Sequence, residues 1–139
     1  MKRILLSILV SIFIVQFSLA QDDKVFEESV NGPKIVFKES SFDFGDINQG
    51  DVVEHVFDFE NTGNEPLILS DVKTTCGCTA PSWPRQPIGP GESGKITVKF
   101  NSRGKVGMQN KIITVLSNAV NQRERIKIVT NVTLPDSEG

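Results

Sequence analysis

Apolar residues recur at every second position through most of the chain from Ile35 to Leu134, and this spacing constrains the fold more than any other feature. A two-residue period is typical of a β-strand that buries one face and exposes the other. No stretch in this range has a convincing helical spacing of three to four residues. The pattern predicts strands over 35–38, 42–44, 53–60, 67–72, 96–101, 112–116 and 126–134. The expected fold class is therefore all-β.

Residues that favour turns separate the predicted strands. The strongest turn signals are Gly45, Asn48-Gln49-Gly50, Asn61-Thr62-Gly63-Asn64, Pro90-Gly91, Arg103-Gly104 and the segment 118–122. About seven short strands with turns at such intervals favour an immunoglobulin-like, two-sheet antiparallel sandwich over a barrel. The two cysteines are only two residues apart, so they cannot form the inter-sheet disulfide of antibody domains, and packing must hold the sandwich together.

The first twenty residues have the order of a secretory signal peptide. Lys2 and Arg3 are followed by a mostly apolar run over 4–17 and by small residues up to Ala20. The apolar run is shorter than the roughly 20 residues that a membrane-spanning helix needs. We expect cleavage between Ala20 and Gln21, with an uncleaved amino-terminal anchor as the alternative.

The rest of the chain divides into a flexible lead-in over 21–33, one sandwich domain over 34–134 and a tail over 135–139. Export would place the domain in the periplasm, at the cell surface or in the medium, with no membrane span after cleavage. Without Lys2 and Arg3, 13 of the 15 basic residues remain against 17 acidic ones, a net charge of −4. This charge argues against a nucleic-acid partner, which would require a basic surface, and against docking on anionic lipid.

The segment between Lys73 and Gly94 has a different composition and is the candidate functional segment. It contains both cysteines, Cys76 and Cys78, and the only tryptophan, Trp83. Four prolines lie within ten residues, at positions 81, 84, 87 and 90. Prolines lower the entropic cost of holding an irregular segment in one shape, so we expect an ordered loop.

Three interpretations of Cys76-Gly77-Cys78 remain open. A disulfide across one glycine would stabilise the fold by only about 1.6 kcal/mol before strain is subtracted, so it would be a redox group or an incidental bond. The two thiolates could instead bind Cu(I) or Zn(II), although two ligands fall short of the four in a structural zinc site. The third interpretation is two small residues packed at one end of the sandwich.

The single histidine, His55, restricts the catalytic mechanisms that are available. It shares a predicted strand face with Val53, Phe57 and Phe59, which predicts a partly buried side chain with a satisfied hydrogen bond. The sequence has no nucleophile-elbow motif, paired-carboxylate signature, phosphate-binding glycine loop or HExxH motif. We therefore expect no catalytic residues and no enzymatic activity, apart from a thiol redox role.

Several of these motifs occur together in one known family. They are Phe42-x-Phe44-Gly45, Asn61-Thr62-Gly63, Thr75-Cys76-Gly77-Cys78-Thr79 and Pro90-Gly91-Glu92-Ser93-Gly94 before Ile96-x-Val98-x-Phe100. The chain from about Ile35 to Leu134 resembles the exported bacterial proteins called domain of unknown function 1573. The cysteine motif is the specific part of this resemblance. It implies an immunoglobulin-like fold similar to domains that mostly bind other proteins, and it implies no particular activity.

The functional expectation is an exported, non-enzymatic module that binds a protein or polymer at the cell envelope. The candidate binding or redox residues are Cys76, Cys78 and Trp83, and the candidate metal ligands are Cys76 and Cys78. The alternative is a thiol redox or copper-handling protein that works through the two cysteines, in which Lys73 or Arg85 would lower a thiol pKa.

Overall fold

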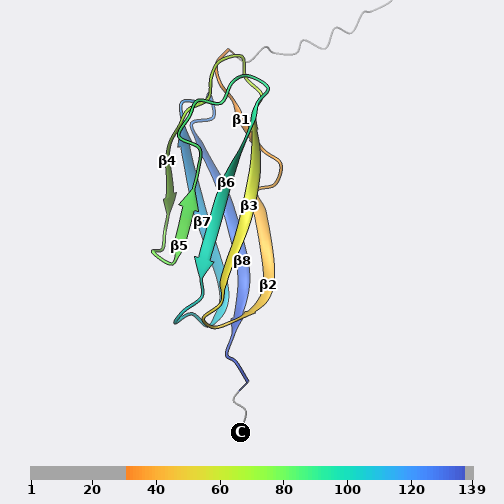
Figure 1. Ribbon diagram of the computed structural model, residues 1–139, viewed down its shortest axis with the longest axis vertical. Coiled ribbons are helices and arrows are strands. Elements are labelled where there is room, and N and C mark those ends of the chain that lie inside the picture. Colours follow the sequence, from red (N-terminus) through yellow and green to blue (C-terminus); the bar gives the residue numbers. More distant parts are fainter. Residues whose placement is uncertain (1–30, 137–139) are drawn as a thin grey trace, which may run out of the picture.

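The computed structural model describes residues 31–136, which form eight β-strands (Figure 1). The predicted signal peptide and its cleavage point lie outside the described residues. The strands are β1 (Ile35–Phe37), β2 (Ser41–Asn48), β3 (Val52–Asn61), β4 (Leu69–Thr74), β5 (Thr79–Ser82), β6 (Ser93–Asn101), β7 (Gly107–Ser117) and β8 (Arg123–Thr133). Within residues 31–136, no helix is long and apolar enough to cross a membrane.

The strands form two four-stranded sheets that pack face to face. The first sheet has the order β1-β3-β6-β5 and the second has the order β2-β8-β7-β4. The predicted two-sheet sandwich is thus confirmed. The prediction that all strands pair antiparallel is wrong for one pair, because β2 runs parallel to β8. This pairing arises because β1 and β2 lie in different sheets, so β2 joins a strand far along the chain rather than its neighbour.

The alternating pattern identifies the core correctly. In β3, Phe57 and Phe59 are fully buried, and they alternate with the more exposed Asp58 and Glu60. The inward residues of the central strands β6 and β8 are equally buried: Ile96, Val98, Phe100, Ile126, Ile128, Thr130 and Val132. Leu134, predicted to continue the β8 face, lies beyond the end of that strand and is 60% exposed.

The segment that forms β4 has no clear alternation because a bulge interrupts it. Leu69 and Val72 are both buried although they are three positions apart, which a regular strand does not allow. The pairing of β4 with β7 shifts between Leu69 and Asp71, so one extra residue brings both side chains to the core face. Asp71 accepts a hydrogen bond from the backbone N–H of Val72 at this bulge (2.8 Å).

Strand β5 is the strand that the sequence did not predict. It lies within the proline-containing segment and pairs antiparallel with β6, from Thr79 opposite Phe100 to Ser82 opposite Thr97. Its sequence, Thr-Ala-Pro-Ser, is a poor strand former, and Pro81 is tolerated because β5 is at the edge of its sheet. The segment between Lys73 and Gly94, which we expected to be one ordered loop, therefore consists of a turn, the edge strand β5 and a second loop.

Asn61 organises one end of the sandwich. Its side chain is fully buried and makes four hydrogen bonds with backbone groups. Nδ2 donates to the carbonyls of Glu65 (2.7 Å) and Ile88 (2.9 Å), and Oδ1 accepts from the N–H groups of Lys34 (3.2 Å) and Gly63 (3.0 Å). All four hydrogen-bonding positions of the amide are thus occupied. The Asn-Thr-Gly motif is a structural device that ties three chain segments together.

The glycines that end the Asn61-Thr62-Gly63 and Pro90-Gly91-Glu92-Ser93-Gly94 motifs are required by close packing. A Cβ on Gly63 would lie 2.0 Å from the carbonyl oxygen of Gly32. A Cβ on Gly94 would lie 2.4 Å from the Phe59 ring and 2.9 Å from Ile88. Gly32 and Pro33, at the end of the predicted lead-in, are themselves buried in this region.

Candidate functional site at the turn between β4 and β5

Cys76 and Cys78 are joined by a disulfide in the turn between β4 and β5. Their Cα atoms are 5.3 Å apart, within the usual range for a disulfide. Both residues are half-buried, whereas Thr75 and Gly77 are exposed. Of the three interpretations of the cysteine motif, the structure shows the disulfide form.

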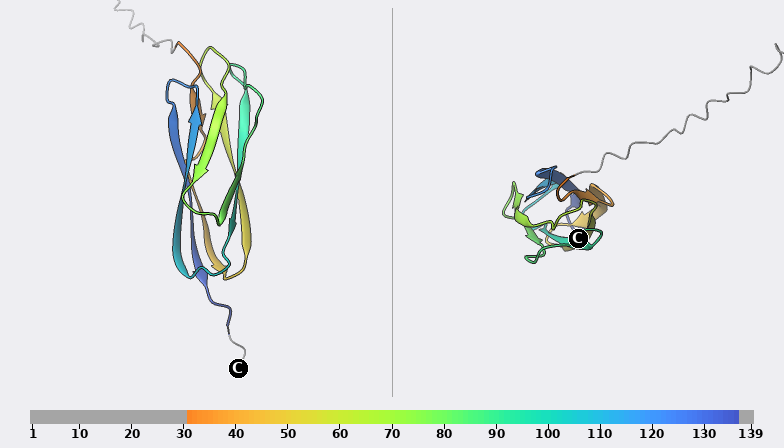
Figure 2. Two further views of the ribbon diagram at one scale, coloured as in Figure 1. Left: turned by 90° about the vertical axis from the view of Figure 1, so that its left-hand side faces the viewer. Right: turned by 90° about the horizontal axis from the view of Figure 1, so that it is seen from above.

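The turn connects the two sheets. Strand β4 is an edge of the second sheet and β5 is an edge of the first, so the chain crosses between the sheets at the disulfide. The side view in Figure 2 shows this turn above the lower end of the neighbouring strands. The cysteines therefore lie on the side of the sandwich where the two sheet edges face each other. The sequence-based expectation of a position in a loop at one end is corrected accordingly.

Hydrogen bonds hold the turn in one shape. Thr74 donates its hydroxyl to the carbonyls of Cys76 (3.1 Å) and Thr79 (3.4 Å). The backbone N–H of Thr79 donates to the carbonyl of Cys76 (3.2 Å), and the N–H of Cys78 approaches the sulfur of Cys76 (3.2 Å). Cys78 also accepts a hydrogen bond from the N–H of Asn101 at the end of β6 (2.9 Å).

Trp83 does not belong to the cysteine site. It follows the last residue of β5, five residues beyond Cys78, which corresponds to about 16 Å along an extended strand. Its ring packs against the core, and the Arg85 guanidinium lies 3.7 Å from the ring centroid. Its indole N–H is buried without a hydrogen-bond partner among the described residues. The segment between Lys73 and Gly94 thus contains two separate features, the disulfide turn and the Trp83 side chain.

The two cations considered as activators of a thiol have other partners. Lys73 forms an ion pair with Asp71 (3.9 Å), and Arg85 stacks on Trp83. The described part of the chain also holds no group of three or more His, Cys, Asp or Glu side chains that could bind a metal ion. Copper or zinc would need both sulfurs as thiolates, so the disulfide would have to be reduced first.

His55 has the environment that the sequence predicted. Its side chain is 18% exposed, and its Nε2 pairs with the carboxylate of Glu39. The ring stacks on Phe42, with 3.6 Å between ring centroids, and meets Phe57 edge-on. His55 therefore packs between the sheets, and its Nε2 has a hydrogen-bond partner.

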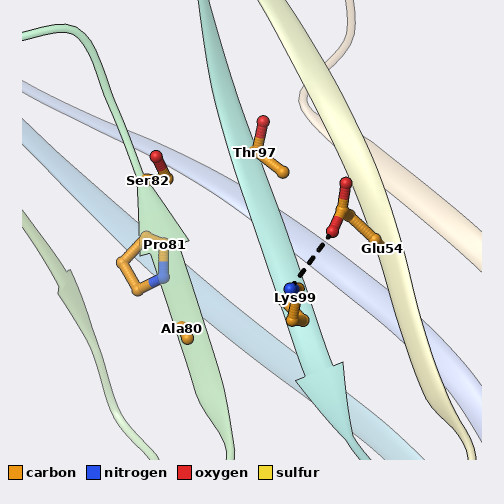
Figure 3. A pocket seen from close by; sticks show the side chains of 6 residues that line it. All are labelled: Glu54, Ala80, Pro81, Ser82, Thr97 and Lys99. Carbon is orange, nitrogen blue, oxygen red and sulfur yellow. Dashed lines mark ion pairs between the residues drawn. The ribbon is translucent and has the colours of Figure 1, made fainter.

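A shallow hollow of about 270 Å³ lies beside β5 on the outer face of the first sheet (Figure 3). It is lined by Glu54, Ala80, Pro81, Ser82, Thr97 and Lys99. Glu54 of β3 and Lys99 of β6 form an ion pair across it (3.6 Å). Composition and motifs did not indicate this hollow, because its residues come from three strands that are distant in sequence.

Cross-strand ion pairs neutralise this outer face. Besides Glu54 and Lys99, Asp58 and Lys95 are directly opposite each other on β3 and β6 and form an ion pair. The hydrogen bond donated by Lys95 holds the pKa of Asp58 below its usual value. The first sheet thus presents paired charges to solvent.

The fold defines a class: immunoglobulin-like β-sandwiches, with neighbours among PapD-like domains. Within that class the chain belongs to the family described as "Protein of unknown function (DUF1573)", whose model matches residues 35–132. The matched range spans all eight strands except the last residue of β8. The family resemblance of the sequence motifs is thus confirmed.

Three solved structures illustrate the likeness. One is a protein of unknown function from Porphyromonas gingivalis W83, 19% identical with a TM-score of 0.64, in which the match covers 74% of this chain and 48% of the other. The second is PapD-like domain 7 of human CEP192, 12% identical with a TM-score of 0.63, covering 76% and 89%. The third is the YadV chaperone, 21% identical with a TM-score of 0.52, covering 76% and 54%.

These likenesses show the fold alone, since each identity is low. The chain spans about half the length of the Porphyromonas gingivalis protein. No curated protein matches the sequence.

Proposed function

We propose that this protein is an exported, non-enzymatic module that binds a partner polypeptide at the cell envelope through the side formed by β4, the disulfide turn and β5. The observation that carries the proposal is that the family's cysteine motif shapes a turn that exposes Thr75 and Gly77, while Cys78 packs against the core beneath them. The Asn61 and Gly94 motifs are explained by buried hydrogen bonds and close packing. The cysteine motif instead shapes an exposed turn, and ordered exposed turns commonly carry binding functions.

Photo-crosslinking at position 77 in the native envelope tests this proposal. A Cβ at Gly77 would have no atom within 4 Å, and its backbone is not in the left-handed region, so a benzoylphenylalanine there is compatible with the fold. Glu65, exposed in the loop before β4, is a matched control position. We expect a discrete protein adduct from position 77 and none from position 65. Equal adducts from both positions, or none from either, would refute a specific binding side.

Thiol exchange is a second candidate, favoured by the half-buried disulfide in a three-residue ring. The disulfide would accept two electrons and two protons from a partner dithiol, leaving two thiols here and a disulfide in the partner. Structural disulfides in secreted proteins typically have potentials below about −300 mV, and exchange-active ones lie above this value. Equilibration with glutathione buffers, followed by mass measurement of thiol-blocked protein, gives the potential. A value below about −300 mV would reject exchange.

A further inference from the structure

Strand β7 is longer than the edge strand that covers it. It has eleven residues, but β4 pairs only with the part from Ile113 to Ser117. β4 ends at Thr74, opposite Ile113, and the chain then leaves the sheet at the disulfide turn. Among the described residues, 107–112 pair with β8 on one side and with no strand on the other. A strand position about 20 Å long is therefore open directly below the disulfide turn.

The edges of the first sheet are protected against strand addition. β1 has only three residues. In β5, the carbonyl of Cys78 faces β6, so alternation turns the backbone groups of Thr79 and Pro81 outward. The N–H of Thr79 is bonded within the turn, and Pro81 has no N–H. A strand approaching β5 would therefore find no free donor at either residue.

The edges of the second sheet are also protected, except at β7. β2 is interrupted by a bulge at Gly45, whose N–H donates to Asp43 (2.7 Å), and the N–H of Asn48 donates to Asp51 (2.9 Å). β4 has the bulge described above. Bulges and blocked donors are the usual means by which natural sheets prevent edge pairing. The open stretch of β7 pairs with β8 without a bulge, and its only edge-protecting features are the charge of Lys111 and the Gln109 side chain, which reaches the carbonyls of Val106 and Gly107 (3.2 and 3.5 Å).

The side chains of this stretch form two different rows. Met108, Asn110 and Ile112 face outward; Met108 and Ile112 are 70% and 40% exposed, and Val106, just before the strand, is 56% exposed. Gln109 and Lys111 alternate with them and are half-buried. An added strand would therefore place one set of side chains beside Met108 and Ile112, with Asn110 between them, and the alternate set beside Gln109 and Lys111.

The surroundings of the open position are basic. Arg103 and Lys105 lie in the connection from β6 to β7, Lys111 lies in the stretch, and Lys127 lies on β8 opposite Ile112. Within residues 31–136, none of these four forms an ion pair. The first sheet, by contrast, carries paired charges. Two copies joined at this edge would bring like charges together, which disfavours self-association.

We propose that residues 107–112 of β7 accept an extended segment of a partner polypeptide in which apolar residues alternate with acidic ones. Backbone hydrogen bonds to β7 would supply the pairing, the apolar side chains would cover Met108 and Ile112, and the acidic side chains would meet Lys111 on the alternate face. This site rests on the proposed binding function and gives it a location and a partner class.

A seven-residue peptide of alternating glutamate and valine, labelled with fluorescein, is the probe, and anisotropy measures its binding to the purified protein. Two further peptides carry N-methyl groups on all glutamates or on all valines. Only one set of residues in a paired strand points its N–H groups at β7, so one methylated peptide should bind about tenfold or more weaker and the other should bind nearly normally. Strand pairing would be overturned if all three peptides bound equally well. It would also be overturned if a peptide of the same composition, with its glutamates and valines in separate blocks, bound as well as the alternating peptide.

Protein variants locate the site. Met108→Glu should weaken the unmethylated peptide about tenfold, because it replaces an exposed apolar contact with a repelling charge. Val36→Glu, at an exposed apolar residue of β1 in the other sheet, is the matched control and should have no effect. Equal weakening by both variants would reject the assignment to β7.

Amide hydrogen exchange separates this occupant from the alternatives. Added peptide should protect alternate amides of residues 107–112. If the same amides are already protected without peptide, sedimentation identifies the occupant. A dimer would mean that a second copy fills the position, and a monomer would mean that another segment of the same chain fills it. Either result overturns the proposal. If peptides fail while crosslinking at position 77 succeeds, strand addition is wrong and the binding function stands. If peptide binding and crosslinking both fail, strand addition and the binding function are both rejected.

Discussion

Asn61→Ala should destabilise the domain far more than the loss of one side chain in a loop would suggest. The substitution removes four hydrogen bonds from a fully buried amide. At about 0.5–1.5 kcal/mol each, their sum is roughly 2–6 kcal/mol. Glu65 is exposed, and Lys34 and Gly63 are half-buried, so water can replace part of this loss. The carbonyl of Ile88 is in a buried residue that water does not easily reach, and it would keep only the bond from the N–H of Leu67 (2.8 Å). We expect a loss of about 3–4 kcal/mol.

Urea denaturation measures this loss, and Asn118→Ala is the matched control. Asn118 accepts from the N–H of Ile68 (2.8 Å) and donates to the carbonyl of Pro66 (3.2 Å), and all three residues are exposed. Its replacement should cost only about 1 kcal/mol, because water takes over both bonds. If the two variants lose equal stability, or Asn61→Ala loses less than about 1 kcal/mol, the view of Asn61 as a structural tie is refuted.

Three further predictions test the core, the disulfide and export. Phe57→Ala should cost about 3–5 kcal/mol in the same assay, since the ring is fully buried, and a loss below about 1 kcal/mol would mean that the packing of β3 is wrongly assigned. Replacing both Cys76 and Cys78 by serine should cost only about 0–2 kcal/mol, because a three-residue ring constrains the unfolded chain weakly; a large drop in melting temperature would contradict this. Amino-terminal sequencing of protein from the native envelope should begin at Gln21, whereas a start at Met1 in the membrane fraction would indicate an anchor.

The alternation of apolar residues was sufficient to predict the core strands. Phe57, Val98 and Ile128 each lie in a strand with one buried face, and burial of that face is what produces the two-residue period. The same logic could not give the sheet partners. The parallel pairing of β2 with β8 depends on which sheet each strand enters, and no local pattern records this choice.

The candidate site was predicted only in part. The cysteine motif was visible because its composition is unusual, but its position between two sheet edges follows from β5, whose Pro81 disguised the strand. Trp83 was grouped with the cysteines because the two are near in sequence, although an extended strand separates them. The predicted strand over 112–116 corresponds closely to the part of β7 that β4 covers, from Ile113 to Ser117, and the stretch of β7 before it was not predicted.

The place of β8 in the second sheet also determines when the domain can fold. β8 is the last strand among residues 31–136, yet it lies between β2 and β7. The bond from the Thr130 hydroxyl to the carbonyl of Gly45 joins residues 85 positions apart (2.8 Å). Pairings between such distant residues form slowly, because the intervening chain must first be closed into a loop. Until β8 has been synthesised, β2 has no neighbour and β7 lacks its longest pairing, so this sheet cannot close while its last strand is still missing. The topology thus makes closure of the second sheet depend on β8, whereas all four strands of the first sheet precede β7 in the chain.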